Sequence, residues 1–127
     1  MLRNAAIAPF VPVADLARAR RFYEETLGLV PRQEFGSGVI YDCGDTSLFF
    51  MVPSEGAGSS RASCAFWHVG NLEAEMAELR ARGVVFEEYD RPGCKTVGGI
   101  ATQGRTRTAW FRDSEGNLLA LSQVVPS

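Results

Sequence analysis

The sequence contains few of the residues that bind transition metals or form disulfides. Among its 127 residues it has one histidine, His68, and three cysteines, Cys43, Cys64 and Cys94. Because a zinc or iron site needs three or four converging donors, we expect no metal and no other cofactor. The odd number of cysteines, with no C-x-x-C pair, argues against a disulfide framework and favours a reducing cytoplasm.

The sequence also lacks a long hydrophobic run and an excess of basic charge. No apolar segment approaches the roughly 20 residues of a membrane-spanning helix, and no A-x-A-like cleavage site follows the start of the chain. The formal net charge is -2 and the basic residues do not gather in one run, so we expect no nucleic-acid partner. With 46% hydrophobic and 22% charged residues, the composition is that of an ordinary globular domain.

The strongest pattern in the sequence is an internal repeat. Residues 7–35 and 63–88 each contain a short apolar strand, an Asp or Asn followed by Leu, an amphipathic helix, a glycine and another strand. Asp and Asn are good N-caps, and glycine suits the left-handed residue that ends a helix. The matching pairs are Asp15 with Asn71 and Gly28 with Gly83. The repeat therefore predicts a duplicated supersecondary module.

Further strands complete the predicted fold. We place strands near 29–35, 38–43 and 46–53 in the first unit and near 84–90, 106–112 and 117–124 in the second, with a tight turn at Gly116. We expect residues 91–105 to be a long irregular segment that acts as a lid. The prediction is one α+β domain over 1–127: module 1 (about 5–53), a linker (54–62) and module 2 (about 63–124). Its two β-α-β-β-β modules form a curved, partly open mixed sheet with helices on the outer face.

Large aromatic side chains occur on both faces of these strands. One face must pack against the helices, and the other is then an apolar surface of the kind that binds small molecules or is covered by a second subunit. The alternation of a strand puts Ala8, Phe10 and Pro12 on one face, and Cys64, Phe66 and His68 on the equivalent face of the repeat. The opposite residues should pack on the helices; they are Val11, Val13, Ala65, Trp67 and Val69.

Two segments resemble the vicinal oxygen chelate superfamily, which includes glyoxalase I, bleomycin-resistance proteins and extradiol dioxygenases. They are V-A-D-L…F-Y-E-E-T-L-G-L in the first repeat and A-W-F-R-D-S-E-G-N-L-L-A-L near the end of the chain. The resemblance covers residues 7 to 124. It implies the duplicated module, and for metal-free relatives of the bleomycin-resistance kind it implies a homodimer that binds drugs or metabolites.

The resemblance also implies where a metal would be held in metal-dependent relatives. The two first-strand positions are Ala8 and Cys64, and the position of the glutamate in the last hairpin is Ala120. The remaining position is on the strand before the linker, which offers Ser47, Phe49 or Met51 on one face and Leu48 or Phe50 on the other. Cys64 is the one plausible donor, and one donor does not hold a catalytic ion.

These observations leave three interpretations of function. The first is a metal-free, cytoplasmic binding protein that sequesters or senses an apolar or aromatic metabolite or drug, as a homodimer with no membrane contact. The second is a lyase, isomerase or oxygenase of the same fold, with His68, Tyr89 or Asp90 as acid–base groups. The third is a dimerising module whose open face is merely filled. The predicted ligand-binding residues are Phe10, Phe49, Cys64, Phe66, His68, Tyr89, Trp110 and Ala120.

Overall fold

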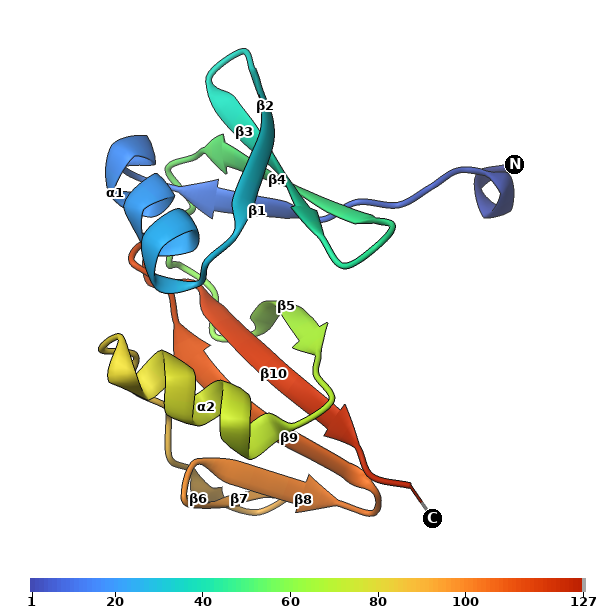
Figure 1. Cartoon of the computed structure of the whole chain (residues 1–127), viewed down its shortest axis with the longest axis vertical. Helices are drawn as coiled ribbons and strands as arrows, with labels where there is room; N and C mark the ends of the chain where they lie inside the picture. Colours follow the sequence, from blue (N-terminus) through green and yellow to red (C-terminus); the bar gives the residue numbers. More distant parts are fainter. Residues whose placement is uncertain (127) are drawn as a thin grey trace.

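The computed structural model describes residues 1–126, and its strands form two open mixed sheets (Figure 1). The four-stranded sheet has the order β1 (Phe10–Val13), β4 (Ser47–Pro53), β3 (Gly38–Cys43), β2 (Val30–Phe35). The six-stranded sheet has the order β5 (Ser63–His68), β10 (Leu118–Val124), β9 (Thr106–Arg112), β8 (Ile100–Gln103), β7 (Cys94–Val97), β6 (Asp90–Arg91). The strands thus form two hydrogen-bonded sheets, where the sequence predicted one. The pairs β1–β4 and β5–β10 are parallel, and the other pairs are antiparallel.

The helices lie beside the sheets, and the two predicted ones begin and end where the sequence indicates. They are α1 (Leu16–Arg21), which continues into the π-helical turn η2 (Phe22–Thr26), and α2 (Leu72–Ala81). The short η1 (Leu2–Asn4) was not predicted. The Asp15 side chain accepts the backbone N–H of Arg18 at 3.0 Å, and Asn71 caps α2 in the same way. Gly28 and Gly83 follow the two helical segments with positive φ angles of 75° and 95°. The α+β fold class is confirmed.

One hydrophobic core lies between the helices and the two sheets. It contains residues of both repeats, including Tyr23, Tyr41, Leu72 and Phe111, each with a relative exposure of 0%. Burial of such a side chain stabilises a fold by roughly 1.5–3 kcal/mol. The predicted alternation is confirmed for the core side: Val11 and Val13 are buried in it, and Ala65, Trp67 and Val69 pack against it. No helix within residues 1–126 is long and apolar enough to cross a membrane.

The segment from 91 to 105 is not the irregular loop that the sequence suggested. It forms β6, β7 and β8, which extend the six-stranded sheet beyond β9. Its glycines lie at the turns, where Gly93, Gly98, Gly99 and Gly104 all have positive φ, and the residues between them pair as strands. Of the strand expected at 84–90, a bridge from Phe86 to Phe111 is formed, and Asp90 belongs to β6. The expectation of a lid is therefore wrong, because this segment is built into the sheet.

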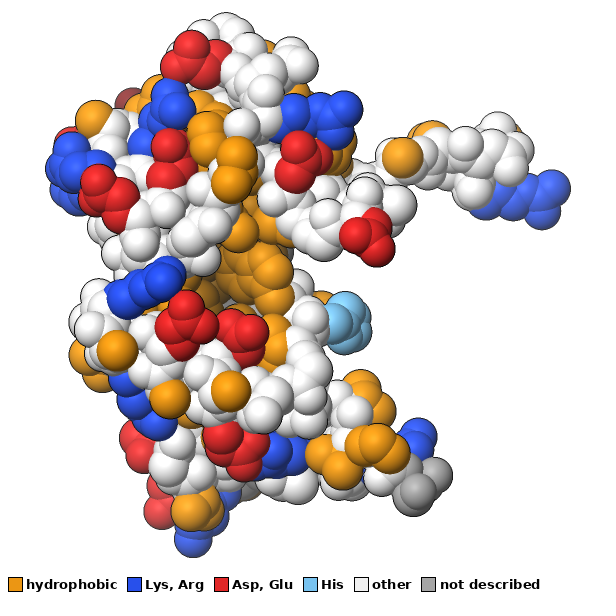
Figure 2. Space-filling view, in the orientation of Figure 1, with side chains coloured by type: hydrophobic (Ala, Val, Ile, Leu, Met, Phe, Trp, Pro, Cys, Tyr) orange, Lys and Arg blue, Asp and Glu red, His pale blue; other side chains and the backbone are white. Residues whose placement is uncertain are grey.

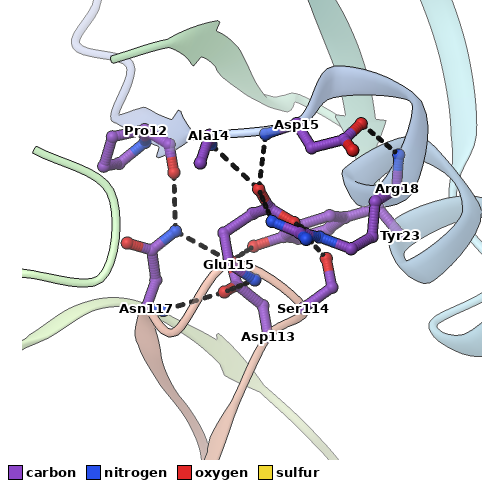
Figure 3. A network of polar contacts seen from close by, with 9 residues as sticks. All are labelled: Pro12, Ala14, Asp15, Arg18, Tyr23, Asp113, Ser114, Glu115 and Asn117. Atoms are coloured by element: carbon purple, nitrogen blue, oxygen red, sulfur yellow. Dashed lines mark hydrogen bonds and ion pairs between the residues drawn. The ribbon is translucent and has the colours of Figure 1, made fainter. Parts of the chain in front are cut away.

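The turn between β9 and β10, residues 113–117, joins the second sheet to the first helix (Figure 3). We call it the clamp turn. The carboxylate of Glu115 accepts the backbone N–H groups of Ala14 and Asp15, both at 2.8 Å. It also accepts two hydrogen bonds from the Arg18 guanidinium and one from the Ser114 hydroxyl. One buried carboxylate from the far end of the chain thus accepts the backbone N–H groups at the start of α1.

Asp113 and Asn117 complete the clamp turn. The Tyr23 hydroxyl donates to the Asp113 carboxylate at 2.6 Å, and the backbone N–H groups of Glu115 and Asn117 donate to the same carboxylate. The Asn117 side-chain amide donates to the Pro12 carbonyl at 2.7 Å (Figure 3). Burial, followed by the charge of Asp113, raises the pKa of Tyr23, so its hydroxyl stays protonated and donates at neutral pH.

Candidate ligand-binding site

The face of the six-stranded sheet that points away from α2 carries a row of aromatic side chains. Pairing aligns Phe66 of β5 with Ala120 of β10, and Ala120 with Trp110 of β9. Because side chains alternate along a strand, this row points away from Trp67, Leu121 and Ala109, which face the core. Beyond β9, the Tyr89 ring lies 5.6 Å from the Trp110 ring. We call the face with Phe66, Ala120, Trp110 and Tyr89 the open face.

A hollow of about 550 Å³ lies on this side of the sheet, next to Trp110. Trp110 and Thr108 come from β9, and Ala101, which pairs with Thr108, comes from β8. The hairpin of β6 and β7 forms the outer wall. We call this the Trp110 hollow; it is lined by Arg91, Gly93, Cys94, Lys95, Ala101, Thr102, Gln103, Thr106, Thr108 and Trp110. Its lining combines an indole ring with hydroxyl, amide and guanidinium groups.

A stack of three side chains borders the hollow. The Tyr89 and Trp110 rings meet edge to face at 72°, and the Arg91 guanidinium lies 4.6 Å from the centre of the Tyr89 ring. The Tyr89 hydroxyl donates to Glu87 at 3.3 Å. Partial burial and the charge of Glu87 raise the pKa of Tyr89 above its ordinary value. Tyr89 is therefore poorly suited to exchange a proton near neutral pH, which weakens its candidacy as an acid–base group.

A second, smaller cavity of about 230 Å³ lies on the opposite side of the sheet, between the two repeats. Figure 2 shows this second cavity, with hydrophobic side chains on its floor. Its walls come from the turn after η2 and from α2, β5, β9 and β10. The lining residues are Leu27, Leu29, Trp67, His68, Val69, Glu75, Leu79, Phe111 and Leu121. We call it the inter-repeat cleft. Most of these residues belong to the core or pack against it.

The predicted site residues of β5 share one exposed side of the strand. Cys64, Phe66 and His68 are all exposed, and the Phe66 and His68 rings lie 4.8 Å apart. Trp110, Ala120 and Tyr89 belong to the same open face. Phe66 is 55% exposed, whereas Ala120 between Phe66 and Trp110 is only 3% exposed. Of the predicted site residues in this sheet, Trp110 is the one whose side chain is part of the lining of the Trp110 hollow.

Phe10 and Phe49 lie in the other sheet. Phe10 is 65% exposed, and its ring contacts Phe50 at 5.9 Å. Phe49 points the other way, into the core, where its ring stacks on Tyr41 at 5.1 Å. The structure therefore places Phe50, and not Phe49, beside Phe10. The parallel register of β1 and β4 decides this, because it aligns Phe10 with Phe50.

Comparison with known proteins identifies the family. The model of the Glyoxalase/Bleomycin resistance protein/Dioxygenase superfamily matches residues 5–121. The chain belongs to this superfamily. The resemblance carried by the two sequence segments is thereby confirmed. The structure shows that these segments touch: the Tyr23 hydroxyl of the first donates a hydrogen bond to the Asp113 carboxylate of the second. Both segments therefore help to join the two repeats of the superfamily fold.

Solved structures agree with this superfamily assignment at the level of the fold. UcmS2 matches with a TM-score of 0.71 and 22% identity, over 92% of this chain and 97% of that one. TnmS3, an antibiotic-binding protein from a Streptomyces species, matches with 0.65 and 22%, over 95% and 98%. Lactoylglutathione lyase from Agrobacterium tumefaciens matches with 0.66 and 16%, over 94% and 93%. No curated protein matches the chain in sequence.

The residues at the metal-binding positions of the superfamily do not fit a metal ion. Ala8 and Ala120 have methyl side chains without donor atoms, and Ala120 is almost completely buried. Cys64 is the one donor at the three positions that the resemblance assigns to single residues. Within residues 1–126, no three His, Cys, Asp or Glu side chains come together in an arrangement that could hold an ion. This donor set therefore does not fit a catalytic metal ion.

Proposed function

We propose that this protein binds an apolar or aromatic small molecule in the Trp110 hollow, without a metal ion, and so sequesters or senses it. The observation that carries the proposal is the hollow itself. Its volume of about 550 Å³ falls within the roughly 300–1,000 Å³ of ordinary ligand sites. Trp110 offers a large apolar surface, and the Thr108 hydroxyl next to it can fix the orientation of a ligand.

The inter-repeat cleft is the weaker candidate. Its volume of about 230 Å³ is below the usual range for ligand sites, and its floor is continuous with the core. A ligand that entered more deeply would have to separate the two repeats. The name of TnmS3 as an antibiotic-binding protein gives independent support for a drug or metabolite as the ligand. A cytoplasmic location belongs to the same proposal, and the three free cysteines support it.

A thermal-shift screen of aromatic metabolites and antibiotics tests the proposed function. A ligand at a hundred times its dissociation constant stabilises the fold by about 2.7 kcal/mol, which raises the melting temperature by several degrees. We expect at least one compound to produce this shift in the natural protein, and we expect Trp110→Ala to abolish it, because the indole is the main apolar surface of the hollow.

Two further variants locate the ligand within the open face. Phe10→Ala, in the other sheet, is the matched aromatic control and should leave the shift intact. Phe66→Ala should reduce the shift only for compounds long enough to cross Ala120. Each variant is compared with its own ligand-free melting temperature, which removes the effect of lost packing. Equal shifts in Trp110→Ala and the natural protein would rule out the Trp110 hollow as the binding site.

We also propose that the protein is a homodimer. Large apolar side chains are uncovered on both sheets and on the segment before β1, with exposures of 65% for Phe10, 55% for Phe66 and 95% for Ile7. Residues 1–8 project away from both sheets (Figure 1), and every one of them is exposed. β1 and β5 each lie at the edge of a sheet. A second copy of the chain would cover these side chains and edges in one symmetric contact.

Sedimentation at tens of micromolar protein tests the dimer. We expect the natural chain to sediment as a dimer, and we expect Ile7→Asp combined with Phe10→Asp to sediment as a monomer that is still folded by circular dichroism. The two positions are exposed, so charge there should not disturb the core. A matched double substitution on the exposed side of α2, Glu75→Gln with Glu78→Gln, should leave the dimer intact. A monomeric natural chain would contradict the proposal.

A further inference from the structure

We propose that the ligand of the Trp110 hollow is an aromatic anion, a planar ring system that carries a carboxylate, sulfonate or similar group, and that Arg91 binds its negative charge. This inference rests on the proposed function and specifies the ligand class of the same site. It follows from the arrangement of Arg91, Tyr89 and Trp110, which together present an aromatic surface that ends in a positive charge.

Arg91 has a charge that its own chain leaves available. Within residues 1–126 it forms no ion pair, whereas Arg18, Arg20, Arg32, Arg82, Arg107 and Arg112 each contact a carboxylate. The Arg91 guanidinium instead rests on the Tyr89 ring at 4.6 Å from its centre. This contact holds the planar group in place while its N–H donors stay free, which reduces the entropy lost when an anion binds.

The acidic groups nearby do not cancel this charge. Glu87, which lies against Tyr89, is already contacted by the Tyr89 hydroxyl at 3.3 Å and by Arg112 at 3.7 Å. Asp90 is next to Arg91 in sequence, but its side chain lies on the other face of the hairpin. In the strand register Asp90 is aligned with Lys95, whereas Arg91 is aligned with Cys94. No acidic residue lines the Trp110 hollow. Lys95 is the other cationic residue of the lining, but strand alternation puts its side chain on the opposite face of the hairpin from Arg91. We therefore assign the positive charge on the Trp110 side to Arg91.

The geometry also explains why the anion should be aromatic. A guanidinium alone binds any carboxylate or phosphate. Here the Tyr89 ring lies between Arg91 and Trp110, and the centres of the Tyr89 and Trp110 rings are 5.6 Å apart. A flat ligand that contacts the indole therefore extends toward the guanidinium. Thr106, Thr108 and Gln103, which line the hollow together with Trp110, are neutral. A small inorganic anion would use Arg91 and gain nothing from the rings.

Two fluorescent dyes with the same ring system separate the charge from the rings. Anilinonaphthalene sulfonate is an aromatic anion, and N-phenylnaphthylamine is the matching compound without the sulfonate. We expect the natural protein to bind the anionic dye at least about tenfold more tightly than the neutral one, the usual scale for one charge-assisted contact. Arg91→Gln should remove this preference without changing the affinity for the neutral dye. Arg105→Gln, an exposed arginine outside the lining, is the matched control and should keep the preference.

Trp110→Ala distinguishes the failure of this inference from the failure of the proposed function. If the natural protein binds both dyes equally and Trp110→Ala weakens both, the hollow binds aromatic compounds but the inference about charge is wrong. If Trp110→Ala changes neither affinity, the proposed function fails as well. If Arg91→Gln weakens both dyes by the same factor, Arg91 shapes the site instead of binding the charge, and the inference is again overturned. Melting temperatures of all variants confirm that each is folded.

Discussion

Replacing Glu115 by alanine is expected to destabilise the fold by about 4 kcal/mol, because it removes a buried charge on which several donors converge. The Glu115 side chain is 0% exposed. Without it, the backbone N–H groups of Ala14 and Asp15 lose their acceptor at the start of α1. Arg18 loses its partner too, but it is 48% exposed and regains water, which limits its share of the loss. Chemical denaturation measures the change.

Glu34→Ala is the control for the Glu115 substitution. Glu34 also forms an ion pair, with Arg20 at 2.8 Å, but its side chain is 74% exposed. Exposed pairs of this kind contribute about 0.2–1 kcal/mol. We therefore expect the two variants to differ several-fold in the free energy of unfolding. Similar losses in both would show that the clamp turn does not join the two repeats in solution.

The same carboxylate gives the stability a defined dependence on pH. The Arg18 guanidinium, together with the donated hydrogen bonds, lowers the pKa of Glu115 from 4.5 to about 2. Since the folded pKa lies below the unfolded one, the stabilisation is complete above about pH 4.5 and is lost as pH falls toward 2. The shift corresponds to about 3 kcal/mol. In Glu115→Gln this acid-dependent loss should be absent, so denaturation at about pH 6 and pH 3.5 should show a smaller difference than in the natural protein.

The sequence could not predict the clamp turn, although it predicted the hairpin that carries it. Asp113, Glu115 and Asn117 surround a glycine, a pattern typical of an exposed turn. Their burial comes from Pro12, Ala14 and Asp15, about a hundred residues earlier in the chain. By contrast, the helix caps at Asp15 and Asn71 depend on residues three positions away and were predicted correctly. Local signals determine where elements begin; the contact between the repeats is not local.

The candidate site shows the same division between local and non-local information. Strand alternation was sufficient to put Phe66 on the exposed side of β5 and Trp67 on the core side. It could not choose between Phe49 and Phe50, because a shift of one residue exchanges the two faces and the register is set by the partner strand β1. The sequence predicted that Arg91 begins an irregular segment, because the glycines of 91–105 concealed the hairpins that carry it. Its contact with Tyr89 emerges only from the folded chain.

Replacing Gly58 by alanine is expected to destabilise the fold by about 3 kcal/mol, although Gly58 lies in the segment that the sequence describes only as a linker. Two costs combine there. Its φ angle is +73°, a conformation that side chains with a Cβ rarely adopt. An added Cβ would also lie 2.5 Å from the backbone carbonyl oxygen of Glu115, and 3.4 Å from the Cα of Gly116. Backbone atoms cannot rotate away, so the clamp turn itself would have to move.

Two other glycines separate these costs in the same denaturation experiment. Gly83 has a φ of +95° with nothing within 4 Å of an added Cβ, so Gly83→Ala should show the conformational strain alone, about 1 kcal/mol. Gly56 has ordinary φ and only ordinary contacts, the nearest at 3.5 Å, so Gly56→Ala should be close to neutral. The order expected is Gly58, then Gly83, then Gly56. Since the Gly58 N–H also donates to the Asn117 side chain at 3.0 Å, a loss in Gly58→Ala no larger than in Gly83→Ala would mean that this linker does not pack against the clamp turn.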